Sequence, residues 1–496
     1  MQNAPTVKLG IVAVSRDCFP KDLSRERRSA VVAECKKLGF SVFECPQIVE
    51  DEPDVPKALS QLKDAGVNAM VVFLGNFGPE GPETMLAQRF EGPVMVVGAG
   101  EENSGDALMG NRGDAYCGML NASFNLGLRK VKAYIPEYPV GTPDAVAAMI
   151  EEFIPIARVY VGVKKLKIFS FGPRPFNFIA CNAPIKQLFD LGVEIQENSE
   201  LDLYDAYLKH ADDPRIAQVK CEMENELEGH NNFPAVMDKL AQYEITLIDW
   251  LENNLGICEY GVFANKCWPA FQTMFGFVPC YVNSRLAAKG YPVACETDSY
   301  GALSEYILYL ATGMTPTLLD VNNTVPADMY KKNHRTIGSL TNEELFMGFH
   351  CGNTSMCNLK PKTGALKYQL IMKRLIEPNS EPNVSRGTLE GQLKPGDVTM
   401  FRIQGAAEGH ISSYVAQGQI LDIDPCSFGG IGVMAIPEMG RFYRHVLIEK
   451  HFPHHAGIGF AHVGKTLFEV LKLLSVEDIN YNQPASLPYK TENPFK

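Results

Sequence analysis

Two hydrophobic periods alternate along the first hundred residues of this 496-residue chain. Segments 8–14 and 68–74 are apolar after their first residues, Lys8 and Asn68, which is typical of strands that are buried on both faces. Segments 25–38 and 55–65 repeat apolar residues every three or four positions and each precedes a glycine, which predicts amphipathic helices. Strands and helices in this order predict right-handed crossovers and a parallel sheet covered on both faces.

A second unit of the same kind begins near residue 165. Strand-like runs at 165–172 and 193–196 flank a helical pattern at 184–191. Two long polar helical patterns follow, at 212–226 and 234–254. We therefore predict a second doubly wound α/β domain.

From about residue 313 the apolar runs become shorter and are separated by glycine and proline. Segments 396–403 and 411–417 predict antiparallel strands, and a helical pattern at 465–474 is expected to close this part of the chain. The predicted fold is α/β, with two doubly wound parallel-sheet domains followed by a C-terminal domain rich in antiparallel β structure. The expected domains are 1–164, 165–311 and 312–496.

Composition narrows the classes of partner. The formal net charge of −12 disfavours a nucleic-acid or anionic-membrane partner, and no apolar run is long enough to span a bilayer. The first residues lack a basic segment followed by an apolar one, so no secretory signal is predicted. Thirteen scattered cysteines without a Cys-x-x-Cys pair indicate reduced thiols. We expect a cytoplasmic protein.

Carboxylates stand next to predicted core elements in two places. Glu296 follows the strand-like run 291–295, and Asp320 lies beyond the helical pattern 299–312. Asp298 is explained by a capping role at this helix, but Glu296 is not needed for it. Two acids near a core are costly unless they hold a cation, and oxygen ligands suit a divalent ion such as Mn²⁺.

Histidines supply a third group of candidate ligands. Eight of the ten lie between residues 334 and 462. A single histidine is more often a core or surface residue than a ligand, but four within residues 451–462 weaken that explanation. Adjacent side chains of His454 and His455 are expected on opposite sides of the backbone, so that one ligates and the other faces substrate. His350, close to Gly352, is a further candidate.

Other chemistry is disfavoured. The glycine-rich loop 98–105 lacks the spacing of a dinucleotide fingerprint and carries two acids, so no nicotinamide cofactor is expected. Cys295 and Cys351 adjoin candidate residues, but buried cysteines usually act as small apolar groups. Trp268 is a candidate flat apolar wall of a ligand site, although a core role is commoner for tryptophan.

At these residues the chain resembles the L-fucose isomerase and L-arabinose isomerase family of metal-dependent ketol isomerases. Segments 294–298, 320–321 and 454–464 are similar to the family's two carboxylate segments and its histidine segment. The resemblance implies that Glu296, Asp320 and His455 bind Mn²⁺, with Mg²⁺ or Co²⁺ as alternatives. It also implies that His350 is an additional ligand or a substrate contact.

The resemblance implies an aldose–ketose isomerase that acts through an enediol or enediolate on a hexose, deoxyhexose or pentose. Glu296 and Asp320 would move the proton, and either could be the primary base. Family members form hexamers with sites between protomers, so a homo-oligomer is expected and Arg16 is a candidate contact in a neighbouring subunit's site. His454 stands where the fucose enzymes have asparagine, and the identity of the sugar stays open.

Two alternatives remain at this stage. Isomerases of sulfosugars such as sulfoquinovose belong to the same broad group and require a cationic pocket, for which the loop residues Arg16, Lys21, Arg112 and Arg174 are candidates. The other alternative is a non-catalytic sugar-binding protein, because paired α/β domains also form ligand-binding clefts.

Overall fold

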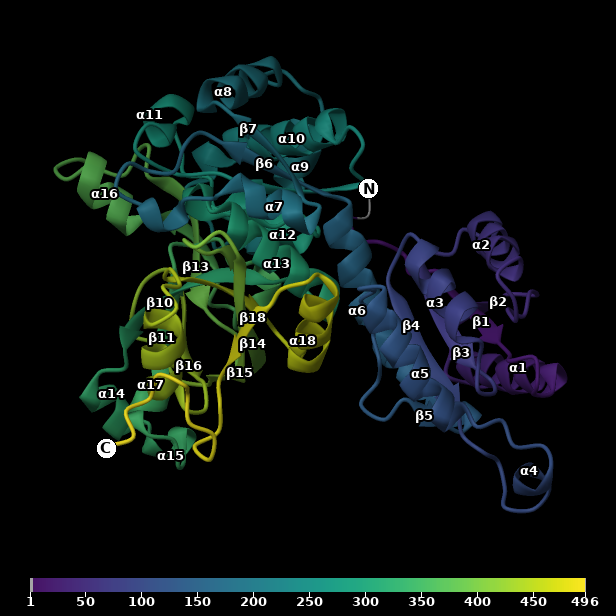
Figure 1. Ribbon diagram of the computed structural model, residues 1–496. Helices are drawn as coiled ribbons and strands as arrows, with labels where there is room; N and C mark the ends of the chain where they lie inside the picture. Colours follow the sequence, from purple (N-terminus) through teal and green to yellow (C-terminus); the bar gives the residue numbers. More distant parts are fainter. Residues whose placement is uncertain (1–2, 496) are drawn as a thin grey trace. The chain divides into compact units, whose positions relative to one another are not determined.

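The computed structural model describes residues 3–495, which fall into two compact units (Figure 1). One unit comprises residues 5–162 and 465–475, and the other comprises residues 3–4, 163–464 and 476–495. The expected end of the N-terminal α/β domain at residue 164 stays a prediction. The larger unit holds both remaining predicted domains as two separate sheets, and their division at residue 312 stays a prediction.

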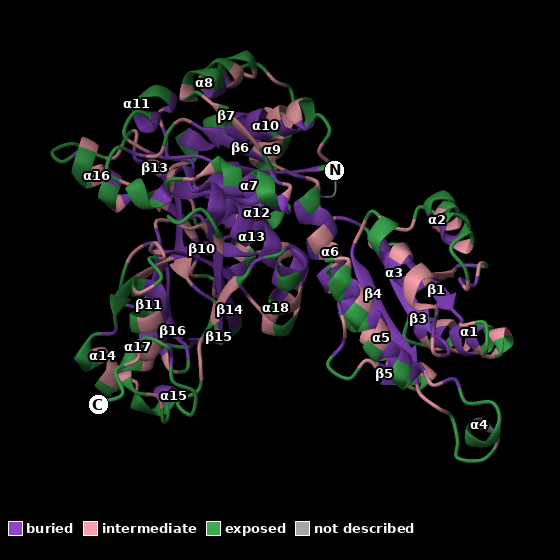
Figure 2. Cartoon of the chain, viewed as in Figure 1, coloured by how far each residue is buried: buried purple, intermediate pink, exposed green. Residues whose placement is uncertain are grey.

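The smaller unit is built around a five-stranded parallel sheet in the order β2-β1-β3-β4-β5. Every residue of β1, β3 and β4 is buried, whereas the helices carry their exposed residues on the side away from the sheet (Figure 2). Its strands are β1 (Leu9–Val14), β2 (Val42–Glu44), β3 (Ala69–Leu74), β4 (Val94–Ala99) and β5 (Val140–Gly141). Its main helices are α1 (Lys21–Lys37), α2 (Asp54–Asp64), α3 (Glu80–Arg89), α5 (Ala115–Leu128) and α6 (Pro143–Lys164).

The last long helix, α18 (Gly464–Leu473), does not close the C-terminal part of the chain as expected. Residues 465–475 belong to the smaller unit, where the Lys465 ammonium lies 2.7 Å from the Glu152 carboxylate on α6. An amphipathic helix packs wherever its apolar stripe finds a complementary surface, and the order of elements along the chain does not reveal that surface.

The larger unit contains a four-stranded parallel sheet in the order β7-β6-β8-β9, which confirms the second α/β layer. Its strands are β6 (Leu166–Phe171), β7 (Glu194–Asn198), β8 (Tyr260–Ala264) and β9 (Val293–Ala294). The accompanying helices include α7 (Ile185–Leu191), α8 (Glu200–Lys209), α9 (Ile216–Leu227), α10 (Met237–Asn254), α12 (Cys280–Ala288) and α13 (Ser299–Thr312).

A nine-stranded sheet follows in the order β12-β13-β16-β11-β10-β17-β14-β15-β18. An additional β15–β16 pairing joins β16, β11, β10, β17, β14 and β15 into a closed antiparallel ring. The sheet consists of β10 (Thr317–Thr324), β11 (Leu345–His350), β12 (Ala365–Tyr368), β13 (Arg386–Gln392), β14 (Gly396–Gly405), β15 (Ile411–Leu421), β16 (Gly430–Ala435), β17 (His455–Gly459) and β18 (Asp478–Tyr481). The predicted fold class is confirmed.

None of the described helices combines the length and the apolar character needed to cross a membrane.

Glu83 on α3 makes stability of the smaller unit depend on pH. Among the described residues, neither carboxyl oxygen of Glu83 has a hydrogen-bond partner, and burial, with a smaller contribution from Glu80, raises its pKa to about 8. The stability that protonated Glu83 contributes is fully present below the unfolded pKa near 4.5. It is lost as the pH rises through the folded pKa of about 8. Glu83→Gln should therefore stabilise the protein at pH 8–9 by about 2–5 kcal/mol, as measured by urea denaturation across pH.

The exposed Glu52 provides the control, because Glu52→Gln should leave the pH profile of the unfolding free energy unchanged. A Glu83→Gln protein with the same pH profile as the parent would show that Glu83 is charged in the folded state.

Candidate active site

Glu296 is presented by a strained turn between β9 and α13. Its backbone φ is 59° and that of Thr297 is 60°, in the left-handed region that side chains with a Cβ rarely adopt. The turn forms the short 3₁₀ segment η3 (Cys295–Thr297), directly before the cap of α13. Strain of this kind persists where the surrounding structure enforces it, and it is concentrated at functional sites.

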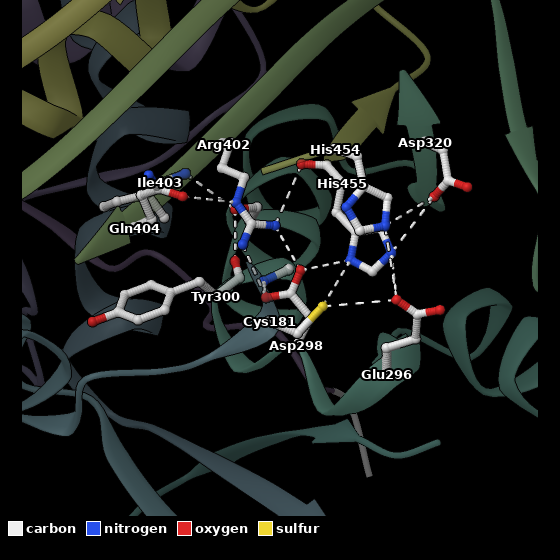
Figure 3. A network of polar contacts seen from close by, with 12 residues as sticks. Cys181, Glu296, Asp298, Tyr300, Asp320, Arg402, Ile403, Gln404, His454 and His455 are labelled. Carbon is white, nitrogen blue, oxygen red and sulfur yellow. Dashed lines mark hydrogen bonds and ion pairs between the residues drawn. The ribbon is translucent and has the colours of Figure 1, made fainter. Parts of the chain in front are cut away.

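Asp320 and His455 are brought together by strand pairing. They face each other in the β10–β17 register, and β10 also pairs with β11, which ends at His350. The His455 Nε2 atom lies 3.5 Å from both Glu296 Oε2 and Asp320 Oδ1 (Figure 3). The structure therefore brings together all three residues of the predicted triad.

His454 does not point away from His455 as expected. Its Nε2 atom lies 3.7 Å from Glu296 Oε2 and 3.9 Å from Asp320 Oδ1, and the two imidazole centroids are 4.2 Å apart. The reason is that β17 begins at His455, so His454 lies ahead of the strand and the alternation of strand side chains does not apply to it. Both imidazoles therefore face the two acids (Figure 3).

Asp298 fixes the orientation of His455. Its Oδ2 lies 2.8 Å from His455 Nδ1, and the Arg402 guanidinium binds both Asp298 oxygens at 2.6 and 3.0 Å. A hydrogen bond from Nδ1–H to this carboxylate leaves the Nε2 lone pair directed at Glu296 and Asp320. The expected cap is also present, since Asp298 accepts a hydrogen bond from the Gly301 N–H at 2.9 Å.

Charge at Asp298 is retained in spite of its burial. Burial alone would raise its pKa, but the Arg402 guanidinium and the His455 hydrogen bond lower the pKa below its ordinary value. By contrast, burial raises the pKa of Asp320, and the nearby imidazoles only partly oppose this effect. The positive charge that faces an ionised Asp320 can come only from these imidazoles among the described residues, at 3.5 Å from His455 Nε2 and 3.9 Å from His454 Nε2.

The acids open into a cavity of about 680 Å³ within the larger unit. A volume in the range of about 300–1,000 Å³ is typical of small-molecule sites. His350 and Trp268 also line this cavity, and the Trp268 ring makes an edge contact with Phe178 at 5.5 Å between centroids. Burial, together with the neighbouring imidazoles, lowers the pKa of His350 to about 3, so this imidazole is neutral.

The four cations proposed from loop contexts lie elsewhere. Arg16 is in the smaller unit, 3.9 Å from Glu80, and its predicted substrate contact stays a prediction. Lys21 and Arg112 are in the same unit, paired with carboxylates, and Arg174 donates to backbone carbonyls. In the described part of the chain, none of the four lines the cavity that contains Glu296.

The chain is similar in sequence to known proteins. The family model of the fucose/sulfoquinovose isomerase N-terminal domain matches residues 10–164, and the L-fucose isomerase C-terminal domain model matches residues 348–481. A protein of Alkalicoccus urumqiensis named sulfoquinovose isomerase is 27% identical over 399 residues, covering 78% of this chain and 80% of its own. A protein of the same name from Priestia aryabhattai is 22% identical over 481 residues, covering 96% and 99%.

The chain belongs to the fucose isomerase-like family. The family resemblance found in the sequence is confirmed. The predicted enzyme class, the aldose–ketose isomerases, is confirmed as well; these enzymes are intramolecular oxidoreductases.

Two residues of this fucose isomerase-like site were missed from the sequence. Arg402 is 2% exposed within the apolar run of β14, where a charged residue is itself a signal of a buried partner. Cys181 lies with its Sγ 3.7 Å from Glu296 Oε2 and 3.9 Å from His455 Nδ1, at the end of a loop that carries no pattern. Burial raises the pKa of the Cys181 thiol, so it is a neutral neighbour rather than a nucleophile.

Proposed function

We propose that this protein is a divalent-metal-dependent isomerase that interconverts a six-carbon sulfonated aldose, such as sulfoquinovose, with its ketose. The observation that carries the proposal is similarity along almost the whole chain to proteins named sulfoquinovose isomerase, combined with the convergence of Glu296, Asp320 and His455. A sulfosugar, which the sequence left open as the alternative substrate, is thereby favoured over a neutral hexose, deoxyhexose or pentose.

The residues fit a divalent cation. Among the described residues, the buried atoms Asp320 Oδ1 and His455 Nε2 have no hydrogen-bond partner, although they face each other with Glu296 Oε2 close by. Two carboxylates and one imidazole form a donor set that suits Mn²⁺. A bound cation would acidify the proton next to the sugar carbonyl and stabilise the negative charge of the enediolate.

The chain's own residues would move the proton and orient the sugar. One of the two carboxylates takes the C2 proton of the aldose and delivers it to C1, and the second proton moves between O1 and O2. His350 Nδ1 accepts a hydrogen bond from the Cys351 N–H at 2.9 Å, so the proton of this neutral imidazole is on Nε2. His350 would therefore donate to a sugar oxygen, and Trp268 would pack against the carbon skeleton.

The family resemblance supports a proposal for assembly, and the sequence features support one for location. We propose a homo-oligomer, with a hexamer as the expected state and Arg16 contributing to a neighbouring subunit's site, in the cytoplasm.

A substrate panel tests the proposed function. The protein loaded with Mn²⁺ should convert sulfoquinovose to its ketose faster than it converts glucose, L-fucose or L-arabinose, as followed by ¹H NMR. Removal of the metal with EDTA should lower this turnover at least about 100-fold, and added Mn²⁺ should restore it.

Each contrary outcome removes a different part of the proposal. Turnover of neutral aldoses alone would exclude the sulfosugar, and turnover that survives chelation would exclude the metal. Binding of sulfoquinovose without turnover in either state would favour a non-catalytic sugar-binding protein.

A further inference from the structure

Arg374 is the one lysine or arginine among the described residues that line the cavity containing Glu296 and Asp320. It lies on the short helix α16 (Leu370–Ile376), in a segment that the sequence patterns did not single out. A site that accepts a permanently anionic sulfonate needs a cation or other donors, because the anion loses its hydration on binding. Arg374 is therefore the residue by which this chain itself can recognise an anion in the cavity.

The Arg374 guanidinium has no ion-pair or hydrogen-bond partner among the described residues. Among residues 3–495, no carboxylate lies within ion-pair distance of it and no hydrogen bond involves its side chain. Arg402, by comparison, is fully committed to Asp298 in the interior. An arginine without an internal partner at the wall of a cavity retains its five N–H donors for a ligand.

Arg374 differs from Glu296 and Asp320 in its exposure to solvent. Glu296 and Asp320 have side chains that are 15% and 20% exposed and lie at the floor. Arg374 is exposed, as are its helix neighbours Ile371 and Leu375, which also line the cavity and form its rim. In an open-chain six-carbon sugar the reacting carbons C1 and C2 and the substituent at C6 are at opposite ends, so a sulfonate and the reacting carbons need different residues of the cavity.

The rim also suits the chemistry of the group. A guanidinium offers a planar fork that binds two oxygens of an oxyanion at once, and this pairing is stronger where apolar neighbours exclude water. The exposed apolar side chains Ile371 and Leu375 flank Arg374 and supply such surroundings when a ligand covers them.

We propose that Arg374 on α16 is a specificity-determining residue that binds the sulfonate of the substrate while C1 and C2 lie at Glu296 and Asp320. This inference rests on the proposed function and adds to it the group that distinguishes sulfonated from neutral aldoses.

Arg374→Met tests this inference because it removes the charge and keeps an apolar side chain of similar length. The variant is expected to raise the KM for sulfoquinovose about 10- to 100-fold, the loss expected for a charge-assisted pair. Its kcat should change much less, because the sulfonate is remote from the reacting carbons. The selectivity for sulfoquinovose over whichever neutral aldose responds should fall by the same factor as the KM rises.

Lys373→Met is the matched control. Lys373 precedes Arg374 on the same helix, but its ammonium donates to the Glu377 and Pro378 carbonyls and it does not line the cavity. The Lys373→Met substitution removes the same charge and should leave the KM for sulfoquinovose within about twofold of the parent. Arg374→Lys, which keeps the charge without the fork, should give an intermediate KM.

The outcomes separate the two proposals. If the parent protein converts sulfoquinovose and Arg374→Met keeps its KM, the assignment of Arg374 is overturned and the proposed function stands. If the parent converts only neutral aldoses, the proposed function fails and the assignment fails with it. A KM that rises equally in Arg374→Met and Lys373→Met would show a general charge effect and would also overturn the assignment.

Discussion

Glu296→Gln is expected to lower kcat for sulfoquinovose by about 10²- to 10⁴-fold, the range associated with loss of a positioned general base. The amide preserves the shape of the side chain but cannot accept the C2 proton, and it is a poorer donor to a divalent cation. Steady-state kinetics with saturating Mn²⁺ measure the effect, and circular dichroism checks that the fold is kept.

Asp397→Asn provides the matched control for this substitution. The Asp397 side chain is 70% exposed at the start of β14, so loss of its charge should leave kcat unchanged. Full activity in Glu296→Gln would remove Glu296 from the mechanism. Asp320→Asn in parallel would show whether one acid contributes more than the other.

Arg402→Met is expected to destabilise the larger unit by about 3–5 kcal/mol, because it leaves Asp298 as a buried carboxylate without its ion-pair partner. Both side chains are 2% exposed, so solvent cannot replace the guanidinium. Urea denaturation at pH 7, followed by tryptophan fluorescence, measures the free energy of unfolding; Trp250 and Trp268 both lie in this unit.

The same ion pair predicts the sign of a pH effect. Since the pKa of Asp298 is lowered in the folded state, its contribution is present above the ordinary aspartate value and is lost as pH falls through the folded value. Stability of the parent should therefore fall more steeply below pH 4 than that of Arg402→Met. Arg444→Met, which removes a 56% exposed guanidinium paired with Glu449, should leave the free energy of unfolding nearly unchanged. Equal losses in the two variants would contradict a structural role for the buried pair.

Local sequence patterns predicted the elements that depend on local interactions. The helix expected at 299–312 is α13, with the same bounds, because Asp298 caps its start and Gly313 ends it in a left-handed conformation. The parallel sheets were predictable for a similar reason, since continuous apolar runs report burial on both faces. Glu296 could be singled out because capping did not explain it.

Long-range pairing determined what the sequence could not show. The ring of six strands depends on the β15–β16 pairing, and no local pattern specifies which strand becomes the neighbour of another. The same limit applies to Arg374 and Cys181, whose place at the cavity or beside Glu296 follows from packing of distant segments. The expected divergence of His454 and His455 was wrong because it assumed that both lie within the strand.

Closure of the strands around β10 determines which donor of the candidate metal site can adjust during turnover. Asp320 and His455 lie on the neighbouring strands β10 and β17 of the closed antiparallel ring, which has no free edge. Neither residue can therefore shift without breaking several backbone hydrogen bonds. Glu296 lies in the 3₁₀ segment η3, outside the ring of strands. We therefore expect the Glu296 carboxylate to be the mobile ligand, able to move toward or away from the candidate metal site while Asp320 and His455 keep their positions.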